Sequence, residues 1–173
     1  MNSVVKAFIP EAKAIKYRAS IDVLNKHFTG LIVAKQTDSL TRHLVFVTEL
    51  GMRMFDFEWK GDSMKPVYVF EPLNKPKLVK ALVKNFETIF LVKWFNKNVE
   101  IRDESQEEVL HLKEGKKDMF FIDDKRHPLE IQWVFYKHRR ETMTIYASNY
   151  DHIKLKQFGL VKLYIEMEKI KEQ

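Results

Sequence analysis

The stretch Leu44–Trp59, LVFVTELGMRMFDFEW, decides the fold, because it holds two strand-like runs joined by a tight link. Apolar and polar residues alternate within the runs, which is the period of a half-buried β-strand. The link is Leu50-Gly51. Polar residues usually occupy such turns, so a leucine at this position needs an explanation.

Alternation of the same kind recurs along most of the chain and predicts an antiparallel sheet. The links between runs are short, which favours antiparallel neighbours. The expected strands are Tyr17–Val23, Phe28–Lys35, Arg42–Glu49, Met52–Trp59, Met64–Phe70, Val99–Arg102, Val109–Leu112, Met119–Asp123, Leu129–Phe135, Thr142–Ala147 and Val161–Glu168.

One segment changes period and predicts a helix, Pro76–Val92. Its apolar residues recur at spacings of three and four, with Lys77, Lys80, Lys84 and Asn85 between them. Asn74 is a candidate cap, and Pro76 suits the first turn.

The predicted fold class is therefore α+β: a curled, unclosed antiparallel β-barrel covered by one long helix. A sheet with this many strands tends to curl, and the helix is available to fill its concave face. At 173 residues the chain is expected to form a single domain, 1–173.

Composition limits the classes of partner. The net charge is +6 and the pI is near 9.3, which suits nucleic acid, anionic lipid or simply a lysine-rich solvated surface. Phe55, Phe57 and Trp59 alternate with the acids Asp56 and Glu58, an unfavourable setting for phosphate, so nucleic acid is not expected. No apolar run approaches the roughly 20 residues of a membrane-spanning helix.

Catalytic patterns are not found in the sequence, and no enzymatic activity is expected. It has neither a glycine-rich phosphate loop nor a GxSxG motif. The six histidines occur singly, and there is no cysteine, so we predict no catalytic residue, metal site or cofactor. Asp123-Asp124 is read as part of a turn, because adjacent carboxylates on a strand point to opposite faces.

Large apolar side chains are abundant: thirteen phenylalanines, seven methionines and three tryptophans. They fill either a closed core or the wall of a cavity for an apolar ligand. The residue types alone leave both alternatives open.

The segment His27–Phe70 resembles the LolA/LolB family of bacterial lipoprotein carriers and receptors, with the outer-membrane receptor LolB as the nearer member. The similarity lies in the order strand, polar turn Thr37–Ser39, strand, Leu50-Gly51 link, strand and glycine turn Lys60–Asp62. The helix and the closing strands after Asp151 follow in the family's order.

This resemblance implies an apolar cavity that holds the acyl chains of lipoproteins, with no bond made or broken. It also implies that Leu50 contacts a membrane or an acyl chain, whereas a single leucine otherwise folds back onto the core. The candidate cavity residues are Phe46, Phe55, Phe57, Trp59, Leu82, Phe86, Trp133 and Phe135.

The expected partners are lipoprotein acyl chains or another lipid, a membrane surface and a periplasmic carrier protein. The expected location is the periplasmic face of the outer membrane, with the signal and the lipidated cysteine absent from this chain; the alternative is cytoplasmic. A structural or protein-interaction module of the same fold, with a filled core and no lipid, is the alternative function.

Overall fold

The computed structural model describes residues 14–39, 41–61, 63–90, 100–104, 107–114, 117–124, 130–137, 140–148 and 151–171. Side chains are described for 14–39, 41–61, 63–90, 134, 141–146 and 151–171.

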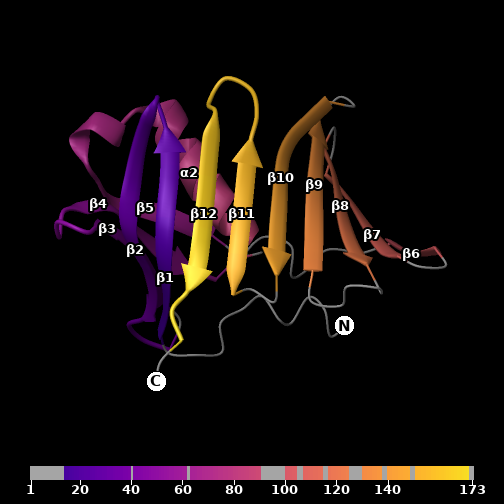
Figure 1. The fold of residues 1–173 in the computed structure, drawn as a ribbon, viewed down its shortest axis with the longest axis horizontal. Helices are drawn as coiled ribbons and strands as arrows, with labels where there is room; N and C mark the ends of the chain where they lie inside the picture. The colour runs from indigo at the N-terminus through magenta and orange to yellow at the C-terminus, as the bar shows by residue number, and fades with distance from the viewer. Residues whose placement is uncertain are drawn as a thin grey trace. The chain divides into compact units, whose positions relative to one another are not determined.

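Each expected strand is confirmed, with bounds shifted by a few residues at most. The strands are β1 Ala14–Val23, β2 Lys26–Gln36, β3 Thr41–Thr48, β4 Arg53–Lys60, β5 Ser63–Val69, β6 Glu100–Glu104, β7 Glu107–Glu114, β8 Lys117–Asp124, β9 Glu130–Lys137, β10 Arg140–Ser148, β11 His152–Gln157 and β12 Leu163–Lys169. A short 3₁₀ helix η1, Glu71–Leu73, and the α-helix α2, Pro76–Ile89, lie between β5 and β6 (Figure 1).

The sheet is antiparallel and, among the described strands, not closed. The contacts group the chain into two units, 1–20 with 28–96 and 169–173, and 21–27 with 97–168. Hydrogen-bonded neighbours run β5-β4-β3-β2-β1 in the first unit and β12-β11-β10-β9-β8-β7-β6 in the second, and β1 contributes residues to both. The predicted open antiparallel sheet with one α-helix is thus confirmed for the described part of the chain, while the single-domain interpretation stays a prediction.

In the first unit, one face of the sheet is apolar and is covered by α2. This inner face is built by register, since directly paired residues share a face. Ile32 pairs with Phe46, and Phe46 pairs with Phe55. The buried inner-face residues are Tyr17, Ala19, Ile32, Ala34, Leu44, Phe46, Phe55, Phe57, Trp59 and Met64.

Gly30 allows β2 and β3 to approach closely at one end of this face. It pairs with Thr48, and a Cβ atom added to Gly30 would lie 2.0 Å from the carbonyl oxygen of Val47. A backbone carbonyl cannot withdraw as a flexible side chain can. The absence of a side chain at Gly30 is therefore what permits the local approach of the two strands.

Two predictions about α2 are wrong. Its N-cap is Lys75 rather than Asn74, although Pro76 does occupy the first turn. Asn85 does not lie on the polar side of the helix but is buried. The reason is spacing: Asn85 is seven residues after Leu78 and three after Leu82, so it belongs to the apolar stripe. The predicted last residues of the helix, after Phe90, lie outside the described residues.

The second unit also has one buried and one exposed sheet face. The buried face is aliphatic, with Ile145 paired to Leu155 and Leu155 to Ile165. The opposite face holds His152, Lys154, Tyr164 and Glu166. The buried residues of this face are Ile21, Val23, Met143, Ile145, Ile153, Leu155, Leu163, Ile165 and Met167, and Val134, which pairs with Thr144 on the opposite face, is also buried.

Candidate functional site

Four of the predicted cavity residues meet in one cluster of phenylalanine rings between β3, β4 and α2. Phe55 stacks on Phe57 with a centroid separation of 4.6 Å, because residues two apart on a strand share a face. Phe86 of α2 lies 5.3 Å from Phe55 and 6.2 Å from Phe57. Phe46 lies 5.5 Å from Phe55. All four side chains are buried, and rings at these separations are in contact.

Trp59 and Leu82, also predicted to line the cavity, are buried at the edges of the same layer. The Trp59 ring lies 5.6 Å from Phe90, and its Nε1 donates a hydrogen bond of 3.1 Å to the carbonyl of Gly61. The helix is also tied to the edge strand, because the buried Glu87 accepts a 2.9 Å hydrogen bond from the Met64 amide.

Trp133 and Phe135 lie on β9 of the second unit, and their side chains are outside the described set. The register pairs Trp133 with Ile145 and Phe135 with Met143, both of which are buried. They are therefore placed on the strand at positions that match the buried face. Whether they line a cavity stays a prediction, as it does for the other candidates.

Leu50 occupies a tightly hydrogen-bonded turn and points away from the protein. The Gly51 amide donates to the Thr48 carbonyl at 2.9 Å, and the Thr48 amide donates to the Met52 carbonyl at 2.9 Å. Gly51 has φ +81°, the left-handed residue that ends a hairpin loop of this length. Leu50 is 93% exposed, so it does not fold back onto the core.

Asn85 is a buried polar group in the apolar stripe of α2. Its side-chain nitrogen is buried, with no hydrogen-bond partner among the residues that the structure describes. An unsatisfied buried donor costs about 1–3 kcal/mol, so such groups are uncommon. Sequence reasoning missed this group because asparagine was assigned to the polar side by residue type.

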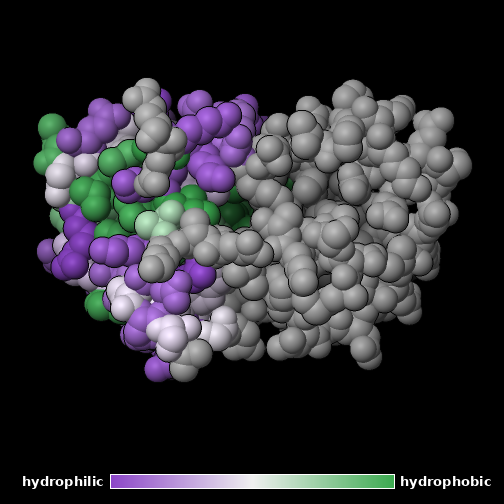
Figure 2. All heavy atoms as spheres, turned by 90° about the horizontal axis from the view of Figure 1, so that it is seen from below, coloured by the Kyte–Doolittle hydropathy of each residue, from purple (hydrophilic) through white to green (hydrophobic). Residues whose placement is uncertain are grey.

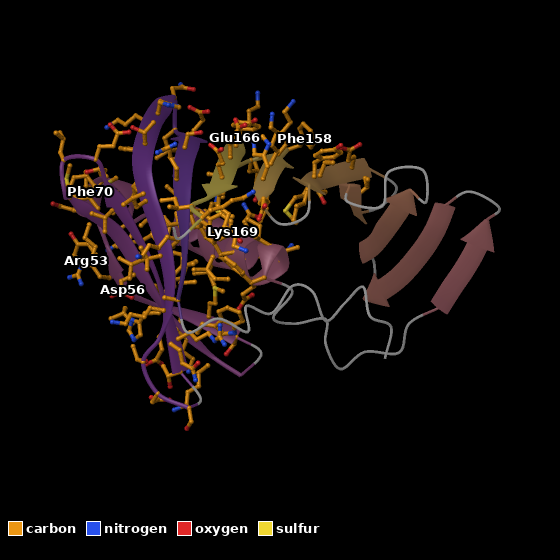
Figure 3. All side chains as sticks on the ribbon, turned by 60° about the horizontal axis from the view of Figure 1, so that its bottom comes forward. Arg53, Asp56, Phe70, Phe158, Glu166 and Lys169 are labelled. Carbon is orange, nitrogen blue, oxygen red and sulfur yellow. The ribbon has the colours of Figure 1, made fainter. Side chains whose placement is uncertain are left out.

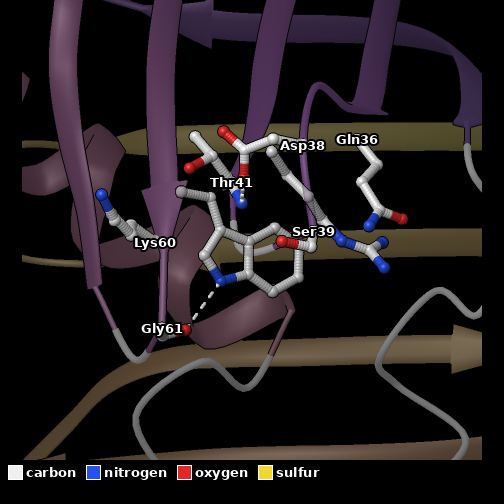
Figure 4. Close-up of a pocket in the computed structure, with 8 residues that line it drawn as sticks. Gln36, Asp38, Ser39, Thr41, Lys60 and Gly61 are labelled. Atoms are coloured by element: carbon white, nitrogen blue, oxygen red, sulfur yellow. Dashed lines mark hydrogen bonds between the residues drawn. The ribbon is translucent and has the colours of Figure 1, made fainter.

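A pocket of about 390 Å³ lies near the β2–β3 and β4–β5 turns (Figure 4). The guanidinium of Arg42 lies 5.5 Å from the centroid of the Trp59 ring. The Asp38 carboxylate accepts a 2.8 Å hydrogen bond from the Thr41 amide and so shapes the turn. The lining residues are Gln36, Asp38, Ser39, Thr41, Arg42, Trp59, Lys60 and Gly61. Only Trp59 among them was a predicted site residue.

The opposite face of the first unit carries a small ionic group. Asp56 on β4 is bonded to His43 Nδ1 at 2.7 Å and lies 3.7 Å from a guanidinium nitrogen of Arg53 (Figure 3). That guanidinium lies 4.3 Å from the centroid of the Tyr68 ring. These contacts join the three neighbouring strands β3, β4 and β5.

A second ionic group lies on the exposed face of the second unit, centred on Glu166 (Figure 3). Its carboxylate bonds to His152 Nε2 at 2.7 Å, and lies 3.2 Å from both Lys154 Nζ and the Tyr164 hydroxyl. The hydrogen bond to His152 is the main cause of the lowered pKa of Glu166. Desolvation, followed by the charge of Glu166, raises the pKa of Tyr164.

Two features are absent from the described residues: a metal-binding cluster and a membrane-spanning helix. No group of three or more histidine, cysteine, aspartate or glutamate residues is placed there to hold a metal ion. None of the described helices has the length and apolarity needed to cross a bilayer. On the face seen in Figure 2, apolar residues are visible between hydrophilic ones in the described part.

Comparison with known proteins gives no family. No protein-family model and no curated protein matches the sequence. Among solved structures, the chain is similar to a DUF1329 family protein from Desulfovibrio piger ATCC 29098, with a TM-score of 0.47 and 10% sequence identity. The similarity covers 97% of this chain and 88% of that chain.

Proposed function

We propose that this protein binds the acyl chains of lipoproteins in its apolar interior and passes them to the outer membrane, as a LolA/LolB-like carrier or receptor. It makes and breaks no bond. The proposed location is the periplasmic face of the outer membrane. The observation that carries the proposal is Leu50, which is 93% exposed at the turn where the resemblance places a membrane or acyl-chain contact.

The structure of this turn supports a contact role for Leu50. Hydrogen bonds fix the backbone on both sides of Leu50 and hold its side chain in solvent. Binding through this side chain therefore orders little additional backbone and loses little conformational entropy. Exposure of a large apolar side chain has no stabilising effect on the free protein. Contact with an acyl chain or a bilayer removes that surface from water.

Asn85 supports a ligand in the interior of the first unit. Its side-chain nitrogen is a buried donor without a described partner, on the same helix stripe as Leu78 and Leu82. The ester and amide carbonyls beside lipoprotein acyl chains are acceptors. A hydrogen bond from Asn85 to such a carbonyl would satisfy the donor and fix the depth of the chain.

The test uses the whole protein and a synthetic diacylated lipopeptide carrying a fluorophore. We expect saturable binding, and native mass spectrometry of protein purified from a bacterial host is expected to show a co-purifying lipid. Asn85→Leu should weaken lipopeptide binding about tenfold and raise the free energy of unfolding by about 1 kcal/mol. Asn74→Leu makes the same change at an exposed position and should alter neither quantity.

A second candidate, a structural or protein-interaction module with a filled core, is favoured by one observation. Phe55, Phe57 and Phe86 are buried and in direct ring contact, so no ligand separates them. This candidate predicts a lipid-free mass spectrum and no lipopeptide binding. That result, together with an Asn85→Leu variant that is stabilised but otherwise unchanged, would overturn the acyl-chain proposal.

A further inference from the structure

The β11–β12 loop of the second unit exposes apolar side chains from a fixed backbone. Phe158 is 46% exposed and Leu160 is 97% exposed. The Phe158 amide donates to the Thr142 carbonyl at 2.9 Å, and Gln157 Nε2 donates to the Val161 carbonyl at 3.1 Å. Gly159 between them has φ +110°, a conformation that suits glycine. These two hydrogen bonds and the conformation of Gly159 fix the loop with the Leu160 side chain in solvent.

The β1–β2 turn lies at the same end of the second unit. β12 neighbours β1 and runs antiparallel to it, and the Ile170 amide donates to the Lys16 carbonyl at 2.9 Å (Figure 1). This pairing brings the start of β12 beside the end of β1. The turn at Leu24-Asn25 and the loop at 158–162 therefore adjoin, and both belong to the second unit.

Leu24 adds an exposed leucine in an unfavourable conformation. It is 42% exposed with φ +52°, and Asn25 follows with φ +59°. Asparagine, aspartate and glycine tolerate this left-handed region, whereas leucine rarely adopts it. The two-residue turn between β1 and β2 requires positive φ at both central residues, so this leucine is held in the strained conformation with its side chain partly in solvent.

Exposed lysines surround these side chains. Lys26 follows the β1–β2 turn, and Lys156 and Lys162 flank the loop. Within the described part of the chain, no ion pair joins them to a carboxylate. The acidic groups nearby are engaged: Asp22 lies 2.6 Å from His27, and Glu141 accepts a hydrogen bond from the Thr144 hydroxyl.

We propose that this second-unit tip, made of Leu24, Phe158, Leu160, Lys26, Lys156 and Lys162, docks on an anionic lipid bilayer. Apolar side chains inserted at the headgroup boundary, with cations at the level of anionic headgroups, are the two signals that hold a protein on a membrane surface. The charge pattern favours a bilayer over a second copy of this chain, whose tip would present lysines to lysines. This inference does not rest on the proposed function.

The test is co-sedimentation of the full chain with phosphatidylcholine vesicles that contain phosphatidylglycerol, and with phosphatidylcholine vesicles alone. The protein should bind the anionic vesicles, more weakly at high salt. Leu160→Glu should lower the partition coefficient about tenfold or more. The double variant Lys156→Gln, Lys162→Gln should lower binding to anionic vesicles only.

Matched controls come from the first unit. Leu31 lies on β2 and is as exposed as Leu24, so Leu31→Glu is the control for the leucine. Lys65→Gln removes an exposed lysine on β5 and is the control for the lysines. Neither should reduce binding. Equal binding of wild type and Leu160→Glu, or equal losses in the controls, would overturn the proposal. So would a dimer, seen by light scattering, that Leu160→Glu dissociates. If the wild-type protein bound the anionic vesicles but not the lipopeptide, only the acyl-chain function would be overturned.

Discussion

The β3–β4 turn and the β11–β12 loop both expose a leucine almost completely, yet their surroundings differ. Leu50 has the exposed Met52 two residues after it, with Glu49 on one side and Arg53, which lies 3.7 Å from Asp56, on the other. Leu160 has Phe158 two residues before it and Lys156 and Lys162 on either side. The same residue type at two loops therefore has two physical settings. Both present apolar area, but the charges beside Leu50 are of both signs, whereas those beside Leu160 are lysines.

The difference in charge implies a difference in task. Transfer of one leucine side chain out of water is worth about 1.5–3 kcal/mol, which holds a protein on a bilayer only transiently. Several apolar side chains together with lysines give stable attachment to an anionic surface. Under the two proposals, the second-unit tip attaches the protein and Leu50 meets the acyl chain during transfer.

The largest expected effect tests whether both leucines lie outside the folded core. Phe86→Ala removes a buried ring that contacts Phe55 and Phe57, and should lower the free energy of unfolding by about 3–5 kcal/mol. Leu50→Ala and Leu160→Ala should change it by no more than about 0.5 kcal/mol. Urea denaturation measures all three. A cost above about 1 kcal/mol for either leucine would show that it supports the fold.

A second prediction separates the structures beneath the two leucines. Gly30→Ala places a methyl group against the Val47 carbonyl at the base of the Leu50 hairpin, and should cost about 1–3 kcal/mol. Gly159 has nothing within 4 Å of an added Cβ atom, but its φ is +110°. Gly159→Ala should therefore cost about 1 kcal/mol through backbone strain alone. Equal costs measured by urea denaturation would contradict the steric explanation for Gly30.

Hydrophobic period predicted the sheet and the helix because both patterns extend over many residues. Leu44–Trp59 is the best example, since both expected strands and the link between them are found there, whereas the period left the exposure of Leu50 open. Asn85 was misassigned because residue type was given more weight than spacing. Leu24, Phe158 and Leu160 were missed for a different reason: loops have no period, and exposure there depends on backbone hydrogen bonds between distant residues, such as Phe158 to Thr142.

The third prediction compares substitutions of Leu50 and Leu160 in two assays, lipopeptide transfer and vesicle binding. Leu50→Glu should reduce transfer of the fluorescent lipopeptide to vesicles about tenfold, while vesicle binding falls less than twofold. Leu160→Glu should instead reduce vesicle binding about tenfold and lipopeptide transfer less than twofold, provided that transfer is measured with the protein already bound to the vesicles. Circular dichroism and thermal unfolding confirm that both variants fold. Equal effects of the two substitutions in both assays would remove the distinction between the tips.

A smaller effect is expected at Leu24, where the two roles of a residue oppose each other. Leu24→Asn places a residue that tolerates positive φ in the turn, and should raise the free energy of unfolding by about 0.5 kcal/mol. The same change removes apolar area from the second-unit tip and should weaken vesicle binding about threefold. Leu31→Asn is the control for loss of an exposed leucine without relief of strain. A destabilised Leu24→Asn variant would contradict the strain argument.

The smallest effect is the pH dependence of stability that Glu166 confers. Glu166 lies on the exposed sheet face of the second unit, outside both the Leu50 turn and the second-unit tip. The pKa of Glu166 lies below its ordinary value of 4.5, chiefly because His152 bonds to the carboxylate. The ionised group therefore stabilises the fold above the ordinary pKa, and this contribution is lost as the pH falls through the lower pKa of the folded state. Glu166→Gln should reduce stability slightly at neutral pH and have a smaller effect at acid pH, below the ordinary pKa of the group.

Glu168→Gln on the same strand is the control for the loss of one negative charge, because Glu168 is exposed. Urea denaturation at the two pH values measures both variants. Vesicle binding by Glu166→Gln should equal that of the wild type, since Glu166 lies outside the second-unit tip. If the free energy of unfolding differed between wild type and Glu166→Gln by the same amount at low and at neutral pH, the hydrogen bond to His152 would not be the source of the stabilising effect of Glu166. A change in vesicle binding would instead extend the docking surface onto this face of the sheet.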